Sequence, residues 1–264
     1  MIINSINTVH NNNISSRGCA EYRRGVALYD YFTTSGFLRP KFNWRDYIFF
    51  LEKTYKDIPK VNIISHACSE AQETFSIKFL IMHYLGKHGL EKYHVEGRDF
   101  DAVNILYAKK GSYVVTPAEM QRLKSELGLD LYNYIDVCGE SDDAIFIKVK
   151  DYIREQVPLK KVDILKDNDI PSENTSLLSR NMWPYMPERM QIQLGEKLFN
   201  QLSPSSHIVL GDFDISNKIP EMLEKIGFVH TDFPGIMKKP DVRNVTQEDA
   251  KTVLNRIRVL NNKI

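Results

Sequence analysis

Residues 61–109 have the sequence VNIISHACSEAQETFSIKFLIMHYLGKHGLEKYHVEGRDFDAVNILYAK. Within them, the short apolar run at 61–65 is typical of a buried strand, and the run YHVEG at 93–97 is expected to form a second strand. Each run is followed by a segment whose apolar residues have helical spacing, at 70–85 and at 101–109. Because strands that alternate with helices usually pair in parallel, this part of the chain predicts a βαβ unit of a parallel sheet.

The same alternation continues toward the C-terminus. We expect strands at 161–165, 175–179 and 207–211, helices at 187–202, 219–226 and 247–260, and an edge hairpin formed by 228–230 and 235–238. A helix at 118–127 and a strand at 144–149 interrupt the pattern as a small antiparallel insertion. The predicted fold is therefore α/β and doubly wound, with a mostly parallel Rossmann-like sheet, an antiparallel C-terminal edge hairpin and a small inserted subdomain.

The N-terminal part of the chain is less regular. Residues 1–16 are polar and rich in asparagine and are expected to form a loosely held arm, whereas apolar residues within 42–51 have the spacing of one helix face. No internal repeat and no long Gly, Ser or Pro linker marks a domain boundary. We expect an N-terminal arm and helical stub at 1–55 and one α/β domain at 56–264, with its insertion at about 112–157.

The composition narrows the class of protein. The 264 residues carry 35 basic and 34 acidic side chains, so no strong field attracts nucleic acid. The most apolar run, 75–85, is much shorter than the roughly 20 residues of a membrane-spanning helix, and no signal-peptide core is present. Three widely spaced cysteines argue against a disulfide framework and a structural zinc site. We expect a cytoplasmic protein without a bound metal that binds neither nucleic acid nor membrane.

In open α/β sheets, ligands bind at the carboxyl ends of the strands. The first predicted strand is followed by residues 66–73, a turn of small residues that opens a helix. The second is followed by Asp99 and Asp101, at about the distance where an acid binds the ribose of a nucleotide cofactor. No G-x-G-x-x-G run is present, and the two aspartates fit a helix N-cap and a first-turn acid equally well.

Five segments occur in an order that belongs to one family. They are TTSGFLR (33–39), ACSEAQETFSI (67–77), RDFDAVNIL (98–106), VDIL (162–165) and SRNMWPY (179–185). This order resembles the CheR-type chemotaxis-receptor glutamate O-methyltransferases, whose motifs are N-x-T-x-F-F-R, A-C-S-T-G-E-E-P-Y-S-I, S-D-I-D, N-L-L and C-R-N-V-x-I-Y-F. The resemblance covers residues about 33–240 and implies a Rossmann-like methyltransferase that uses S-adenosylmethionine.

The resemblance also implies a role for particular residues. The implied cofactor-binding residues are Thr33, Ser35, Arg39, Glu73, Asp99, Asp163, Ile164, Arg180 and Asn181. Among them, Asp99 would hold the ribose, and Asp163 and Ile164 would lie beside the adenine. Arg39 and Tyr185 are the implied catalytic residues near the transferred methyl group. The cofactor would leave as S-adenosylhomocysteine.

The implied reaction is methylation of a glutamate carboxylate in a protein substrate, such as a chemoreceptor-like helical protein. A carboxylate is already ionised at neutral pH, so the reaction needs alignment of the two reacting atoms rather than a strong general base. An arginine such as Arg39 can bind both carboxylate oxygens through its planar fork. A nucleophile made of Cys68 and His66 is disfavoured because no aspartate or asparagine partner is implied.

Some positions depart from the family pattern. The family's G-E-E-P corresponds here to Ala71-Gln72-Glu73-Thr74, and Arg98 replaces a small serine before the ribose acid. These changes leave two other hypotheses: a catalytically silent CheR-like regulatory module that binds S-adenosylmethionine, and a carboxyl methyltransferase for small acids. In the family, a helical domain precedes the arginine segment. Because this arginine is already residue 39 here, we expect the helical domain to be missing or reduced to a stub.

Overall fold

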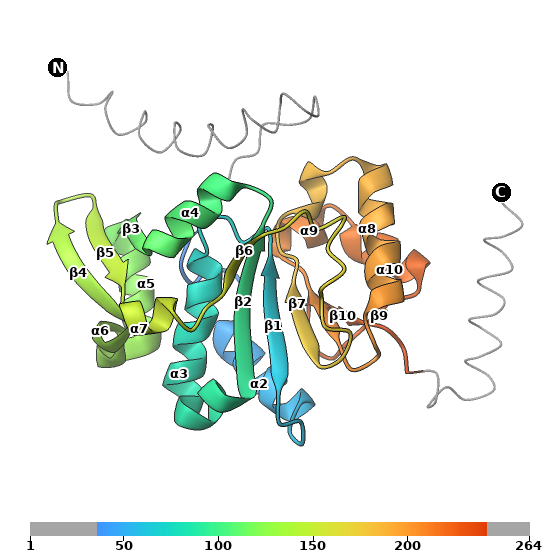
Figure 1. Cartoon of the computed structure of the whole chain (residues 1–264), viewed down its shortest axis with the longest axis horizontal. Coiled ribbons are helices and arrows are strands. Elements are labelled where there is room, and N and C mark those ends of the chain that lie inside the picture. The colour runs from blue at the N-terminus through green and yellow to red at the C-terminus, as the bar shows by residue number, and fades with distance from the viewer. Residues whose placement is uncertain (1–35, 242–264) are drawn as a thin grey trace, which may run out of the picture.

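The computed structural model describes residues 36–241 and has a seven-stranded sheet at its centre (Figure 1). The strand order is β6-β2-β1-β7-β8-β10-β9. The strands are β1 (Val61–His66), β2 (Tyr93–Asp99), β6 (Leu159–Lys161), β7 (Thr175–Leu178), β8 (His207–Val209), β9 (Val229–His230) and β10 (Ile236–Lys238). β1 pairs in parallel with β2 and β7, while β10 runs antiparallel to β8 and β9. The predicted doubly wound sheet with an antiparallel edge hairpin is confirmed, and its strand order reverses between β1 and β7.

Helices cover both faces of this sheet (Figure 1). One face is covered by α2 (Trp44–Thr54), α3 (Gln72–Lys92) and α4 (Ala102–Lys110), and the other by α8 (Glu188–Gln201) and α10 (Ile219–Ile226). The neighbouring residues Ile63 and Ile64 of β1 belong to separate hydrophobic clusters, as the two-residue period of a strand requires. No helix within residues 36–241 combines the length and apolarity needed to cross a membrane, and the helix expected at 247–260 lies outside the described residues.

Local sequence explains where several helices begin and end. The Asp101 carboxylate accepts the N–H of Val103 at 2.7 Å and so caps the start of α4. The same helix ends at Gly111, which adopts φ 63°, a value that glycine accepts without strain. α3 continues beyond its expected end, because the chain kinks at Gly86 (φ 55°) and then resumes its helical course.

The strand expected at 161–165 was placed wrongly. The segment that pairs with β2 is Leu159–Lys161, and the chain turns directly after it. Asp163 accounts for this turn because its side chain accepts the N–H of Leu165 at 3.1 Å, a local bond that competes with strand pairing. Residues 162–174 then cross to β7 without forming a helix.

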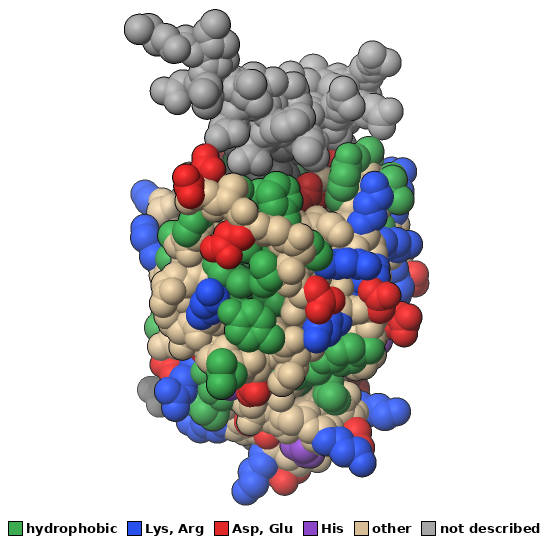
Figure 2. Space-filling model, turned by 90° about the vertical axis from the view of Figure 1, so that its left-hand side faces the viewer, with side chains coloured by type: hydrophobic (Ala, Val, Ile, Leu, Met, Phe, Trp, Pro, Cys, Tyr) green, Lys and Arg blue, Asp and Glu red, His purple; other side chains and the backbone are tan. Residues whose placement is uncertain are grey.

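The insertion forms a second, three-stranded antiparallel sheet in the order β3-β5-β4. Its elements are β3 (Ser112–Val115), α5 (Pro117–Leu127), η1 (Gly128–Asp130), α6 (Leu131–Tyr134), β4 (Ile135–Glu140) and β5 (Ile145–Val149), and α7 (Asp151–Arg154) leads back to β6. The predicted small inserted subdomain is thus present. Figure 2 faces this end of the molecule and shows hydrophobic side chains among charged ones; Val114 and Phe146, which pair across β3 and β5, are exposed.

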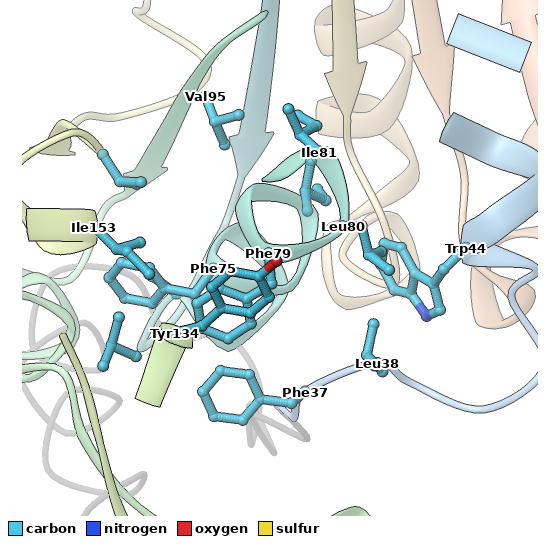
Figure 3. Packing of buried hydrophobic residues seen from close by; sticks show 14 of the residues in the cluster. Phe37, Leu38, Trp44, Phe75, Phe79, Leu80, Ile81, Val95, Tyr134 and Ile153 are labelled. Atoms are coloured by element: carbon cyan, nitrogen blue, oxygen red, sulfur yellow. The ribbon is translucent and has the colours of Figure 1, made fainter. Parts of the chain in front are cut away.

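The insertion and the segment before α2 share one hydrophobic core with the parallel sheet (Figure 3). The ring of Phe79 on α3 stacks at 6.1 Å on Phe37 and at 5.4 Å on Tyr134 of the insertion. Phe75 extends this stack along α3, with its ring 6.5 Å from that of Phe79. Aromatic rings at these separations attract each other in addition to burying apolar surface. The core therefore joins the residues around Arg39 to both sheets.

Candidate active site at the carboxyl edge of the sheet

The loop after β1 has an unusual backbone. Ala67, Ser69 and Ala71 have φ values of 50°, 53° and 66°, in the left-handed region that favours glycine. The loop is nevertheless ordered by hydrogen bonds, because the Cys68 N–H donates to the carbonyl of Arg98 at 3.0 Å. Three left-handed residues at alternate positions store strain where α3 begins, and such strain is often found where a backbone approaches a ligand.

Asp99, at the end of β2, reaches this loop. Its Oδ2 accepts the N–H of Ser69 at 2.7 Å, and its Oδ1 accepts the N–H of Asp101 at 2.8 Å. Burial raises the pKa of the Asp99 carboxyl, and these two backbone N–H groups oppose that change. Of the two aspartates, Asp101 is the helix cap, so Asp99 remains available to orient the loop after β1 and a ligand beside it.

Glu73 and Arg180 join the two strands at which the sheet order reverses. Glu73 lies in the first turn of α3, and its Oε2 is 2.5 Å from Nη1 of Arg180, the second residue after β7. The Arg180 guanidinium also lies over the rings of Phe42 (4.1 Å) and Trp44 (4.9 Å). The Arg180 side chain is only 2% exposed, and the carboxylate and the two aromatic rings hold it in position.

Arg39 lies between two residues with positive φ, Leu38 (42°) and Lys41 (73°). The Leu38 N–H donates to Oγ of Ser76 on α3 at 3.0 Å, which fixes this segment to the helix. Burial lowers the pKa of the Arg39 guanidinium, while the negative charge of Glu73 raises it. Since arginine stays protonated in proteins, the site holds two guanidinium groups, those of Arg39 and Arg180.

A residue of the insertion also holds the Arg39 segment. Oε1 of Glu119, on α5, accepts the N–H of Phe37 at 2.5 Å. Burial raises the pKa of Glu119, and the positive charges of Arg122 and Arg39 oppose this. The inserted subdomain is therefore connected to the candidate site by this carboxylate, in addition to the shared hydrophobic core. No sequence motif pointed to Glu119, because the contact joins residues 82 positions apart.

The turn after β7 carries Asn181 and leads to η2 (Trp183–Tyr185), which includes Tyr185. Asn181 has φ 55°, and its Oδ1 accepts the N–H of Phe213 in α9 (Asp212–Ser216) at 3.0 Å. The Tyr185 ring lies 5.4 Å from the ring of Phe213. Asp214, which the sequence did not single out, also binds this turn. The one available signal was an acid shortly after the strand that ends near Gly211.

Two of the other expected site residues, Asp163 and Ile164, follow β6, which pairs in parallel with β2. Thr33 and Ser35 are outside the described residues. Asp163 lies after β6, where it forms an ion pair with Lys166 at 3.4 Å and lines a cavity of about 310 Å³. Ile164 belongs to the hydrophobic cluster under α8. The structure thus brings six expected residues to the same edge of the sheet: Asp99 ends β2, Glu73 lies in the first turn of α3, Arg180 and Asn181 follow β7, Tyr185 lies in η2 and Arg39 precedes α2.

Buried polar atoms without a hydrogen-bond partner show what a ligand here must offer. Within residues 36–241, Ser69 Oγ and Arg180 Nε are two such atoms, the first a possible donor or acceptor and the second a donor. Leaving such groups unpaired costs free energy, so a polar ligand with an anionic group would be favoured beside them. In the same range, no group of three histidine, cysteine or acidic side chains is placed to hold a metal ion.

The CheR methyltransferase, SAM binding domain, matches residues 34–231. This chain belongs to the CheR methyltransferase family. It is an S-adenosylmethionine-dependent methyltransferase, and S-adenosylmethionine is its cofactor. The polar groups of the candidate site fit this CheR cofactor, which carries ribose hydroxyls and a carboxylate.

Searches for individual relatives add little to the family assignment. No curated protein matches the chain. Among solved structures, a TehB-like SAM-dependent methyltransferase from Corynebacterium glutamicum is 12% identical, with 88% of this chain and 96% of that one covered and a TM-score of 0.39. PKMT2 from Rickettsia typhi is also 12% identical, with 64% and 26% covered and a TM-score of 0.36. The glycopeptide N-methyltransferase MtfA in complex with SAM is 10% identical, with 69% and 59% covered and a TM-score of 0.35. Such low scores identify neither a shared reaction nor a shared acceptor.

Proposed function

We propose that this CheR-family protein transfers the methyl group of S-adenosylmethionine to a carboxylate oxygen of a glutamate side chain in another protein. The observation that supports this proposal best is the pair of guanidinium groups, Arg39 and Arg180, at one edge of the sheet. Glu73 forms an ion pair with Arg180, and its negative charge also raises the pKa of Arg39. The planar fork of a guanidinium can bind both oxygens of a carboxylate, so two such groups at this edge favour an anionic acceptor.

The proposed roles follow from position. Asp99 receives the ribose hydroxyls, while Glu73, Arg180 and Asn181 hold the amino-acid end of the cofactor. When bound, S-adenosylmethionine supplies an electrophilic methyl group on its sulfonium. Arg39 clamps the acceptor carboxylate, and the hydroxyl of Tyr185 orients the reacting groups. Alignment and exclusion of water then supply most of the rate enhancement.

The partner we propose is a protein with exposed glutamates on a helical surface, as in a chemoreceptor. We further propose that Asp163 and Ile164 lie beside the adenine and that Thr33 and Ser35 complete the cofactor site. For this role, the turn after β6 must direct the Asp163 carboxylate toward the adenine. In the structure this carboxylate forms an ion pair with Lys166. A carboxylate at this position accepts a hydrogen bond from the adenine amino group.

A labelling experiment tests this proposal. The protein is incubated with S-adenosylmethionine labelled in its methyl group and with a chemoreceptor-type helical domain carrying acceptor glutamates. Methyl esters release methanol in mild alkali, so we expect base-labile label on the domain and none when its glutamates are changed to glutamine. Arg39→Ala should lower turnover at least 100-fold while leaving affinity for S-adenosylhomocysteine within about threefold. Base-stable label, as expected for an amine acceptor, would contradict the proposal.

One observation favours a second function, that of a catalytically silent binding module. Ala71 is fully buried and has φ 66° where the family motif has glycine. Its methyl group therefore takes up space in the loop after β1 that a glycine would leave open to the cofactor. Tight binding of S-adenosylhomocysteine without methyl transfer to any carboxylate would establish this function. Label confined to a small carboxylic acid in the same assay would instead identify a small-acid methyltransferase.

A further inference from the structure

The carboxylate of Asp214 is the acceptor for four backbone N–H groups. Its Oδ2 accepts from Asn181 (2.5 Å) and from Gly211 (2.8 Å), and its Oδ1 accepts from Met182 (3.1 Å) and Trp183 (3.2 Å). Asp214 is fully buried on the short helix α9, far from Asn181 in sequence. One side chain thus satisfies every N–H group of the residues 181–183, which follow Arg180 directly.

The two segments are also interlocked in the opposite direction. The Asn181 side chain accepts the N–H of Phe213, next to Asp214. A Cβ added at Gly211 would lie 2.2 Å from Oδ1 of Asn181, so no larger residue fits at position 211 while Asn181 keeps this conformation. Asn181 itself is in the left-handed region, where the cost to a non-glycine residue must be offset by contacts such as these.

This arrangement determines where two candidate site residues lie. Arg180 precedes the bound turn and makes the ion pair with Glu73, and Tyr185 follows it and packs on Phe213. We propose that Asp214 is a positioning residue, which holds the turn 180–185 so that Arg180, Asn181 and Tyr185 face the cofactor and the acceptor. This inference rests on the roles given to those residues in the proposed function.

A carboxylate suits this task better than a neutral side chain of the same size. The ionised group has about four lone-pair sites and accepts only, which matches four donors on two oxygens. An asparagine offers a single acceptor oxygen, and its amino group would face one of the two donor pairs. Burial raises the pKa of Asp214 to about 6, while the N–H groups of Gly211, Asn181 and Trp183 and the charge of Arg180 oppose this, so the group is mainly ionised at pH 7.5.

Amide hydrogen exchange at pH 7.5 tests the positioning directly. In Asp214→Asn we expect the amides of one donor pair, Asn181 with Gly211 or Met182 with Trp183, to exchange at least tenfold faster than in the wild-type chain. The matched control is Asp212→Asn, at an exposed position two residues before Asp214. It should leave the exchange rates of all four amides unchanged. The amide of Ser69, bound by Asp99, should keep its protection in both variants. Unchanged protection of all four amides in Asp214→Asn would overturn the inference.

A second variant keeps the test decisive if Asp214→Asn does not fold. Asn181→Gly retains the left-handed conformation and every backbone bond to Asp214, but removes the acceptor of the Phe213 N–H. We expect faster exchange at Phe213 and unchanged exchange at residues 181–183. Tenfold faster exchange at those residues would show that the Asn181 side chain, rather than Asp214, holds the turn.

A binding measurement connects the turn to function. Titration with S-adenosylhomocysteine should show at least tenfold weaker binding to Asp214→Asn than to the wild type and to Asp212→Asn, under conditions where all three remain folded. Equal affinities would overturn the positioning role. If the wild-type chain binds S-adenosylhomocysteine but methylates no carboxylate, the proposed function fails, and the exchange and affinity results still decide the role of Asp214.

Discussion

The loop after β1 and the turn after β7 flank the same reversal point of the sheet, and each is bound by a buried aspartate from a neighbouring segment. Asp99 binds the first loop through the single N–H of Ser69. Asp214 binds the turn after β7 by accepting three N–H groups of that turn, and it also accepts the N–H of Gly211. The first loop has three non-glycine residues with positive φ, and the turn after β7 has one, Asn181.

This difference separates two kinds of loop. Backbone strain in the loop after β1 leaves its conformation open to adjustment when a ligand arrives. The turn after β7 is over-determined, because its hydrogen bonds, its contact with Phe213 and the close approach of Gly211 all fix one conformation. We infer that the first loop adapts to the cofactor and that the second provides a fixed reference for Arg180 and Tyr185.

The contact between the two regions, the ion pair of Glu73 with Arg180, gives the largest expected effect. Glu73→Ala leaves the Arg180 guanidinium buried without its carboxylate and should lower the free energy of unfolding by about 4 kcal/mol. Urea denaturation at pH 7.5 measures it. Asp163→Asn is the control, since its partner Lys166 is 84% exposed and such pairs contribute less than about 1 kcal/mol. Equal losses in both variants would mean that the ion pair does not join the loops.

The pH dependence of stability tests how the turn after β7 is held. An ordinary aspartate has a pKa of 3.8, whereas burial raises that of Asp214 to about 6. Between these values the folded chain keeps a proton that the unfolded chain has released. The contribution of Asp214 is therefore fully present below pH 3.8 and is lost as the pH rises through 6, a change of about 3 kcal/mol.

Comparison with a variant isolates this contribution. Other titrating groups largely cancel in the difference between the unfolding free energies of the wild type and Asp214→Asn. We expect this difference to fall by about 2.4 kcal/mol between pH 4 and pH 7.5, in the direction that favours the variant at high pH. Denaturation curves at four pH values measure it. A difference that stays constant would show that Asp214 has an ordinary pKa.

Sequence patterns predicted the fold well where burial and caps act locally. β1 was found because it is a short apolar run, β2 because it follows the helix at the spacing of a βαβ unit, and α4 because Asp101 and Gly111 mark its ends. The strand at 161–165 was misplaced because Asp163 forms a local turn, which an apolar pattern does not reveal. Confirmation of the edge hairpin shows that even strands of two or three residues can be predicted when turn residues such as Pro234 and Gly235 separate them.

The candidate site was predicted only in part. The order of the family motifs pointed to six residues that the structure brings to one edge, and their roles remain predictions. Asp214 and Glu119 were missed because both act on backbone N–H groups, which carry no sequence signal. The strained loop was also missed, since positive φ at Ala67, Ser69 and Ala71 contradicts the preference of those residue types.

The next prediction concerns the aspartate of the adaptable loop. Asp99→Ala removes the proposed ribose acceptor together with the acceptor of the Ser69 N–H. We expect about 100-fold weaker binding of S-adenosylhomocysteine, because hydrogen bonds to a charged group contribute about 1.5–3 kcal/mol each. Turnover at saturating cofactor should change much less. Asp101→Ala is the control: loss of the helix cap should cost about 1 kcal/mol of stability and leave affinity unchanged. Unaltered affinity in Asp99→Ala would remove Asp99 from the cofactor site.

The smallest expected effect concerns strain in the loop after β1. Ala67→Gly relieves a left-handed alanine at an exposed position, and the greater freedom of glycine in the unfolded chain offsets part of the gain, so stability should rise by at most about 1 kcal/mol. Lys218→Gly, at φ 60° before α10, is the matched control and should give a similar change. The two variants should differ in cofactor binding, because only residue 67 lies in the loop that adapts. Thermal unfolding with and without S-adenosylhomocysteine measures both effects. If the ligand raises the Tm of both variants and of the wild type equally, strain at Ala67 has no part in binding.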